Sequence, residues 1–146
     1  MKTEPITILM ADDDMDDCEL TKEAFVESHL ANDLRFVGDG EELMDYLHRR
    51  GKYADATQSP RPGLILLDLN MPRKSGREAL TEIKSDPQLR GIPVIVLTTS
   101  TAEQDILRSY DSGANSFISK PVGFSELVDA VKSLGKYWFE IVTLPE

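Results

Sequence analysis

Two short runs of the sequence are apolar at every position, Leu64–Leu67 and Val94–Leu97. A strand with one face in water alternates apolar and polar residues, so a strand that is apolar on both faces must be covered on both sides. Helices that pack on each face of a parallel sheet give this coverage. The two runs therefore predict an α/β architecture with a buried parallel sheet.

Other apolar runs alternate with segments that have helical spacing. We predict strands at Ile6–Ala11, Leu34–Val37, Leu64–Leu67, Ile92–Leu97 and Ser116–Ile118. The expected helices contain Leu20–Val26, Leu43–Leu47, Ala79–Ile83, Ile106–Tyr110 and Leu127–Leu134. Five strand–helix units of this kind predict a doubly wound five-stranded parallel sheet with the flavodoxin-like order 2-1-3-4-5 and helices on both faces. In that order the ligand crevice lies at the carboxyl ends of strands one and three.

The length of 146 residues predicts a single domain over residues 1–146, with its core at about residues 6–134. Arg49–Gly63 is rich in Gly, Pro and Ser and is expected to form a long loop. The tail at residues 135–146 carries the only tryptophan, Trp138. A large aromatic side chain at that position favours either packing against the domain or burial in an interface.

The composition narrows the range of partners. The net charge of −10 repels the phosphate backbone, so direct binding to nucleic acid is not expected. Met1–Pro5 has no signal-peptide character, and no apolar stretch approaches the roughly 18 residues that span a bilayer. We therefore expect a cytoplasmic protein with no membrane partner. The single cysteine, Cys18, is expected to be an incidental thiol.

Acidic residues follow two of the predicted strands. Asp12 and Asp13 come directly after strand one, and Asp68 comes directly after strand three. If the two strands are neighbours, their ends bring these three carboxylates together. Their mutual repulsion is usually offset by a bound hard divalent cation, which prefers oxygen ligands. Mg²⁺ is the natural candidate.

The next two strands deliver a hydroxyl and an ammonium group to the same edge. Thr98 ends strand four, and Lys120 follows strand five. Such groups can stabilise the oxygens of a transferring phosphoryl group, with a carboxylate as nucleophile. Each residue taken singly is more often a helix cap or a solvated side chain. Their convergence at one sheet edge favours the functional interpretation.

Together these residues resemble the phosphoacceptor receiver domains of two-component response regulators. The shared set is Asp12, Asp13, Asp68, Thr98 and the Lys120-Pro121 pair, and the match runs from about residue 6 to residue 134. The intervals between these positions also resemble those of the family, and Met71-Pro72 with Gly76 matches its turn after the phosphorylated residue.

The resemblance implies a role for each matching residue. Asp68 would accept the phosphoryl group, while Asp12, Asp13, Asp68 and the backbone carbonyl of Asn70 would hold Mg²⁺. Thr98 and Lys120 would bind the phosphoryl oxygens, and Thr98 and Phe117 would move together as the switch of the activated state. Pro121 would follow a cis peptide bond. Phe117 is equally consistent with ordinary core packing.

The resemblance also implies partners. A histidine kinase would donate the phosphoryl group, and the chain would catalyse only its own phosphorylation and dephosphorylation, signalling through protein contacts. The loop near Lys52–Arg61 and the ending Trp138–Pro145 resemble the single-domain regulators of bacterial phytochrome kinases, in which the tail is associated with homodimers. The same aromatic tail is equally consistent with covering the domain's own core.

The acidic residues after strand one also allow other interpretations. A haloacid-dehalogenase-type phosphatase could use Asp12, although Asp16 stands where that motif has Thr or Val. The spacing of four acidic residues is similar to ligand positions 1, 3, 5 and 12 of a calcium-binding EF-hand loop: Asp12, Asp14, Asp16 and Glu23. However, Asp17 stands at position 6, where that loop requires glycine. Asp14 itself is expected to cap the following helix.

Overall fold

The computed structural model describes residues 6–28, 30, 32–69, 71, 73–98, 116–119 and 124–137. Its strands are β1 (Thr7–Ala11), β2 (Asp33–Val37), β3 (Leu64–Asp68), β4 (Val94–Thr98) and β5 (Ser116–Ser119). Its helices are α1 (Met15–Glu27), α2 (Gly40–His48), α3 (Gly76–Ser85) and α5 (Phe124–Tyr137), with a short 3₁₀ turn η1 (Gly51–Tyr53). The helix predicted around Ile106–Tyr110 lies outside the described residues.

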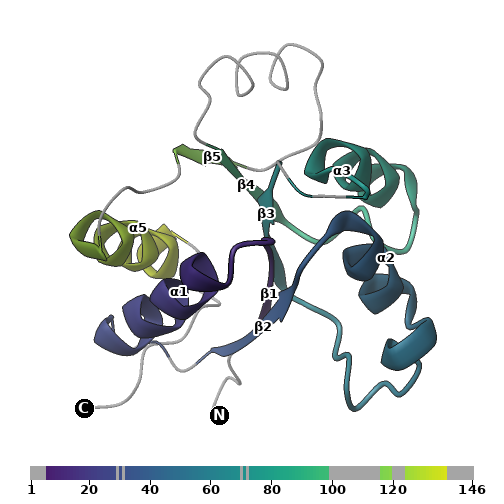
Figure 1. Cartoon of the computed structure of the whole chain (residues 1–146), viewed down its shortest axis with the longest axis horizontal. Coiled ribbons are helices and arrows are strands. Elements are labelled where there is room, and N and C mark those ends of the chain that lie inside the picture. Colours follow the sequence, from purple (N-terminus) through teal and green to yellow (C-terminus); the bar gives the residue numbers. More distant parts are fainter. Residues whose placement is uncertain are drawn as a thin grey trace.

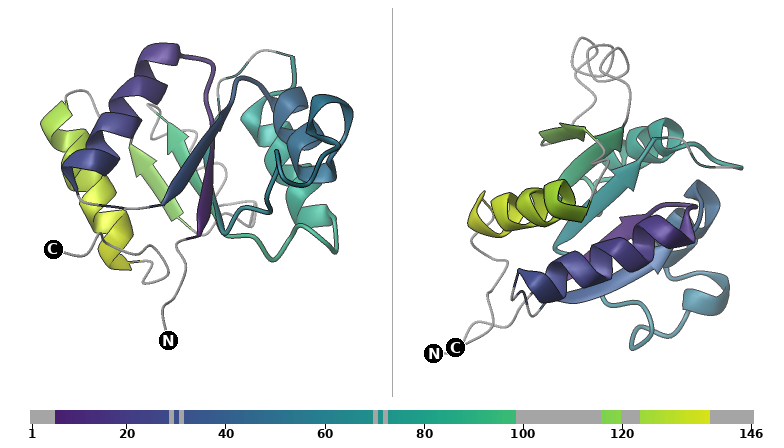
Figure 2. Two further views of the ribbon diagram at one scale, coloured as in Figure 1. Left: turned by 90° about the horizontal axis from the view of Figure 1, so that it is seen from below. Right: turned by 60° about the vertical axis from the view of Figure 1, so that its left-hand side comes forward.

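The strands pair in parallel in the order β2-β1-β3-β4-β5. The predicted parallel sheet with the order 2-1-3-4 and covering helices is confirmed, and β5 pairs beside β4 with Thr98 opposite Ser119. Helices α1 and α5 lie on one face of the sheet, and α2 and α3 lie on the other (Figures 1 and 2).

Two core clusters form on opposite faces of the sheet because successive side chains of a strand point to opposite sides. In β3, Ile65 and Leu67 join the cluster under α2 and α3, while Leu64 and Leu66 join the cluster under α1 and α5. All five residues of β3 are buried. This is the reason for the continuous apolar run that first indicated the sheet.

The predicted strand boundaries differ from the observed ones by at most two residues. β4 begins at Val94 although we predicted a start at Ile92. Pro93 has no N–H for the ladder, and its carbonyl instead accepts from Ile65 N at 2.9 Å. Ile92 is buried in the core without being part of the strand, which explains why it is apolar.

The loop predicted at Arg49–Gly63 is more ordered than a run of turn residues suggests. It contains η1, and the Ser59 hydroxyl, which is buried, donates to the carbonyls of Tyr53 and Asp55. The Tyr46 hydroxyl donates to Pro60 O at 2.8 Å and attaches the loop to α2. Among the helices of the described residues, none is both long and apolar enough to cross a bilayer.

Candidate functional site

The three predicted acidic residues meet at the carboxyl ends of β1 and β3. Ala11, the last residue of β1, pairs with Leu67, so Asp12 lies beside the end of β3, where Asp68 is the final residue. One carboxylate oxygen from each of Asp12, Asp13 and Asp68 lies within 4.8 Å of the others. Asp12 and Asp68 are each only 3% exposed, whereas Asp13 is exposed. The predicted convergence is therefore present.

Carboxylates this close repel one another. At such a separation and an effective dielectric constant near 20, each ionised pair costs about 3 kcal/mol. A bound divalent cation would remove this cost, and carboxylate oxygens are the ligands that hard cations such as Mg²⁺ prefer. Two buried carboxylates and one open to solvent also fit an ion that keeps several waters. The donor set thus fits the expected metal.

The turn after β1 is shaped around the carboxylate of Asp12. Asp14 N donates to Asp12 Oδ1 at 2.9 Å, and Asp12 N donates to Val37 O at 3.0 Å. Asp14 is the N-cap of α1, as predicted, and its side chain accepts from the amides of Asp16 and Asp17. Because α1 begins at Met15, residues 14 and 16 belong to a helix start and not to an EF-hand loop.

Cys18 lies under this turn. Its thiol is 5% exposed and donates weakly to Asp12 O at 3.9 Å. Burial raises the pKa of the Cys18 thiol to about 11, with a further contribution from the negative charges of Asp12 and Asp17. The thiol is therefore expected to stay protonated near neutral pH, as is typical of a buried structural cysteine.

The loop after Asp68 closes back onto the strand it leaves. Gly76 N donates to Leu69 O at 3.1 Å, and a Cβ at Gly76 would lie 2.1 Å from the carbonyl oxygen of Asp68. Only glycine allows this approach. Ser75 and Glu78 form a capping box that starts α3 immediately afterwards. The backbone that carries Asp68 is thus held by the first residue of the next helix.

The turn after β2 supports the same loop from the other side. Gly40 N donates to Lys74 O at 3.0 Å, and a Cβ at Gly40 would lie 2.1 Å from that oxygen. Arg73, whose φ is 64°, places Nη1 3.5 Å from the Asp39 carboxylate. We did not predict this contribution of Asp39 and Gly40. The Asp-Gly pair that follows a strand was its only signal in the sequence.

Glu42 extends this support to the long loop. Its carboxylate accepts from Gly38 N at 2.6 Å, from the Tyr53 hydroxyl at 2.5 Å and from Lys52 Nζ at 2.8 Å. Burial alone would raise the pKa of Glu42, but these hydrogen bonds outweigh it and hold the pKa below its ordinary value. The turn after β2 and the loop that contains η1 are therefore joined through one carboxylate.

Other predicted site residues are described only in part. Thr98 ends β4 and pairs with Ser119, the last residue of β5. The side chains of Thr98 and Phe117 lie outside the described part of the structure. Asn70, Lys120 and Pro121 also lie outside the described residues, as does the tail from Trp138 onward.

Comparisons with known proteins agree with this geometry. The profile of the response regulator receiver domain matches residues 8–132. The response regulator Rcp1 of Synechocystis sp. is 42% identical over 141 residues, covering 97% of this chain and 94% of that protein. A Mn²⁺-bound crystal structure of Rcp1 superposes with a TM-score of 0.81 and covers 97% of this chain and 100% of that one.

Two further solved structures are similar over almost their whole length. The phosphorylated cyanobacterial phytochrome response regulator RcpA is 45% identical, with a TM-score of 0.83, and the match covers 98% of this chain and 100% of that chain. RPA3017, a response regulator in red light signalling of R. palustris, is 37% identical with a TM-score of 0.84. That match covers 98% of this chain and 99% of the RPA3017 chain. The matches give no support to a haloacid-dehalogenase-type phosphatase. With its acidic cluster at the ends of β1 and β3, this chain belongs to the response regulator receiver domain family.

Proposed function

We propose that the chain accepts a phosphoryl group on Asp68 from the phosphohistidine of a histidine kinase, as a single receiver domain over residues 1–146 with the five-stranded flavodoxin-like order 2-1-3-4-5. The observation that carries this proposal is the meeting of Asp12, Asp13 and Asp68 at the end of the sheet. In this reaction the Asp68 carboxylate is the nucleophile. A new O–P bond forms as the P–N bond to the kinase histidine breaks, and the imidazole keeps the electron pair.

Mg²⁺ would be held by the carboxylates of Asp12, Asp13 and Asp68 and by the backbone carbonyl of Asn70. When bound, the ion supplies positive charge that offsets the three carboxylates and the incoming phosphoryl oxygens. Thr98 and Lys120 would orient those oxygens from the ends of β4 and β5, with Phe117 following Thr98 in the activated state and Pro121 after a cis peptide bond. The chain would act on no other substrate, so multiple turnover on phosphate esters is not expected.

We infer further that the kinase is of the phytochrome type and that the chain works in the cytoplasm. The support is the extent of similarity to regulators whose names include phytochrome or red light signalling. A phosphotransfer assay tests the partner. An autophosphorylated bacterial phytochrome kinase should pass its label to this chain at least tenfold faster than an unrelated histidine kinase does. Equal rates from both kinases would contradict the phytochrome assignment.

We also propose that the tail at residues 135–146 contributes to a homodimer. The support is its concentration of aromatic residues, because three of the ten in the chain lie next to one another there: Tyr137, Trp138 and Phe139. Sedimentation of the intact chain should give a dimer, and a chain truncated after Lys136 should give a monomer. Equal monomeric masses for both would contradict the tail interface.

A further inference from the structure

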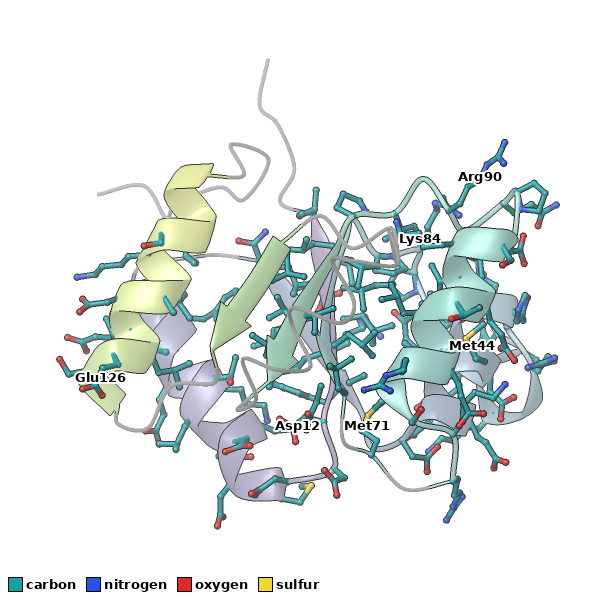
Figure 3. All side chains as sticks on the ribbon, turned by 90° about the horizontal axis from the view of Figure 1, so that it is seen from above. Asp12, Met44, Met71, Lys84, Arg90 and Glu126 are labelled. Carbon is teal, nitrogen blue, oxygen red and sulfur yellow. The ribbon has the colours of Figure 1, made fainter. Side chains whose placement is uncertain are left out.

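A pocket of about 240 Å³ lies at the end of the sheet opposite the acidic cluster. It is lined by Pro62, which precedes β3, and by Ile92, which precedes β4, so it lies at the amino ends of these strands. Figure 3 shows the two ends of the molecule, with Asp12 and Met71 at one end and Lys84 and Arg90 at the other. The pocket is therefore separate from the site of phosphorylation.

The charge of this pocket is opposite to that of the whole chain. Arg49, Arg61 and His48 line it, and none of the described residues that line it is acidic, although the chain carries a net charge of −10. Within the described residues neither Arg49 nor Arg61 forms an ion pair. One carboxylate lies near the pocket without lining it, because Asp86 Oδ2 is 3.9 Å from Nε2 of the lining residue His48. Asp86 lines a neighbouring hollow instead.

The backbone of Arg49, which lines this pocket, has an uncommon conformation. Arg49 ends α2 in the left-handed conformation, with φ 55° and ψ 53°. Arg50 N donates to Asp45 O at 2.8 Å and Arg49 N donates to Tyr46 O at 3.2 Å, the hydrogen bonds of a helix end that normally has glycine at this position. An arginine here is unfavourable for the backbone, and backbone outliers of this kind concentrate at functional sites.

The side chain of Arg49 extends along the pocket wall. Its Nε donates to Ser59 O at 3.3 Å. This bond fixes the direction of the guanidinium and leaves its terminal nitrogens to another acceptor. A guanidinium presents paired N–H groups that match a carboxylate or a phosphate.

The rest of the lining is mixed, with Ser59 and Gln88 as polar members, and the pocket is larger than an oxyanion needs. Leu47, Leu89 and Ile92 line it, and the last two are buried in the core. A water molecule occupies about 30 Å³ of the liquid, so a volume of about 240 Å³ has room for an organic group behind an anionic head.

We propose that this pocket binds a small organic anion, with its carboxylate or phosphate head on Arg49 and Arg61 and its apolar part against Leu47 and Leu89. The site is independent of the phosphoryl chemistry proposed for Asp68, because none of its described lining residues belongs to the acidic cluster.

NMR titrations of the full chain with benzoate, phenylphosphonate and uncharged benzamide test this proposal. The chain is first treated with EDTA and then exchanged into buffer free of metal and chelator, so that no metal ion draws anions to the acidic cluster. Both anions should give saturable shifts at the Arg49 side chain and at Gln88, and benzamide should bind at least tenfold more weakly. The relative affinities of the two anions then identify the head group as carboxylate or phosphate.

Arg49→Gly is the sharpest variant, because glycine favours the backbone conformation found at this position. The variant should be at least as stable as the native chain and should bind both anions about ten- to a hundredfold more weakly. Arg50→Gln is the matched control, since Arg50 pairs with Asp45 and does not line this pocket. Undiminished binding by Arg49→Gly, or equal binding of benzamide and the anions, would overturn the proposal.

Discussion

The two ends of the sheet differ in charge, and Gly76 at one end and Gly91 at the other differ in how closely they are packed. At the carboxyl end, Asp12, Asp13 and Asp68 lie within 4.8 Å of one another, and two glycines bring backbone segments into contact around the Asp68 loop. At the amino end, arginines line a pocket that has no acidic group among its described lining residues. A Cβ added at Gly91, also at this end, would have no described neighbour within 4 Å. The fold thus holds three repelling carboxylates at one end, whereas the other end has a positively charged pocket and, at Gly91, space for an added methyl group.

The largest effect should come from adding a methyl group at Gly76, beside Asp68 at the carboxyl end of the sheet. Gly76→Ala places Cβ 2.1 Å from the Asp68 carbonyl, and backbone atoms cannot give way cheaply. We expect a loss of about 3 kcal/mol in the free energy of unfolding, together with impaired phosphorylation of Asp68. Urea denaturation measures the stability.

Gly91→Ala is the matched control, because its Cβ would meet open space. A neutral effect, or a gain of about 0.5 kcal/mol, is expected from the lower entropy of the unfolded chain. Similar losses from both variants would contradict the difference in packing between Gly76 and Gly91.

The next largest effect should come from removing one charge of the acidic cluster. Comparing Asp13→Asn with Asp14→Asn distinguishes a metal ligand from a residue that only caps α1. In saturating Mg²⁺, at about a hundred times the dissociation constant, a ligand that binds only the folded chain stabilises it by about 2.7 kcal/mol. Asp13→Asn should lose most of this gain and should be slightly more stable than the native chain in EDTA, because one repelling charge is gone. Thermal unfolding with and without Mg²⁺ measures both effects.

The control is Asp14→Asn, one residue further along. Asparagine caps helices as well as aspartate does, and Asp14 is not in the cluster. This variant should keep the full response to Mg²⁺. If Asp13→Asn responds to Mg²⁺ as the native chain does, Asp13 is not a metal ligand.

A smaller effect is expected at Glu42, which joins the turn after β2 to the loop containing η1. Its pKa is lowered in the folded state by hydrogen bonds from Lys52, Tyr53 and Gly38. A lowered pKa means that the ionised group stabilises the fold above its unfolded pKa, and that this contribution disappears as the pH falls through the folded pKa.

Glu42→Gln should therefore cost about 1 kcal/mol at pH 7. The difference from the native chain should narrow as the pH falls below the ordinary pKa of a glutamate, about 4.3, and then through the lowered pKa of Glu42. Urea denaturation across this pH range measures the difference, with Glu41→Gln as the control on the exposed side of the same helix. A cost that is constant with pH would contradict the ionic contribution.

Much of this arrangement could be predicted from the sequence because a few strong local signals determine it. The fully apolar Leu64–Leu67 run required a sheet covered on both faces, and the acidic residues that follow strands one and three had to meet once those strands were neighbours. The capping role of Asp14 follows from equally local chemistry. These predictions required only the strand order and the periodicity of the side chains.

Contacts between distant turns could not be predicted in the same way. The approach of Gly40 to Lys74, and the contact of Glu42 with Tyr53, depend on how two loops meet in three dimensions. The left-handed conformation of Arg49 could not be predicted either, since an arginine in the sequence does not indicate a positive φ. The positions of the strand ends follow from the parallel sheet, whereas the loop contacts that support the site depend on tertiary structure.

Intact mass spectrometry after incubation with Mg²⁺ and acetyl phosphate tests the central claim most directly, with the native chain compared against Asp68→Asn. We predict a labile gain of one phosphoryl group in the native chain, which is lost in EDTA and absent in the variant. No gain in the native chain, or an equal gain in Asp68→Asn, would contradict the assignment of Asp68 as the phosphoacceptor.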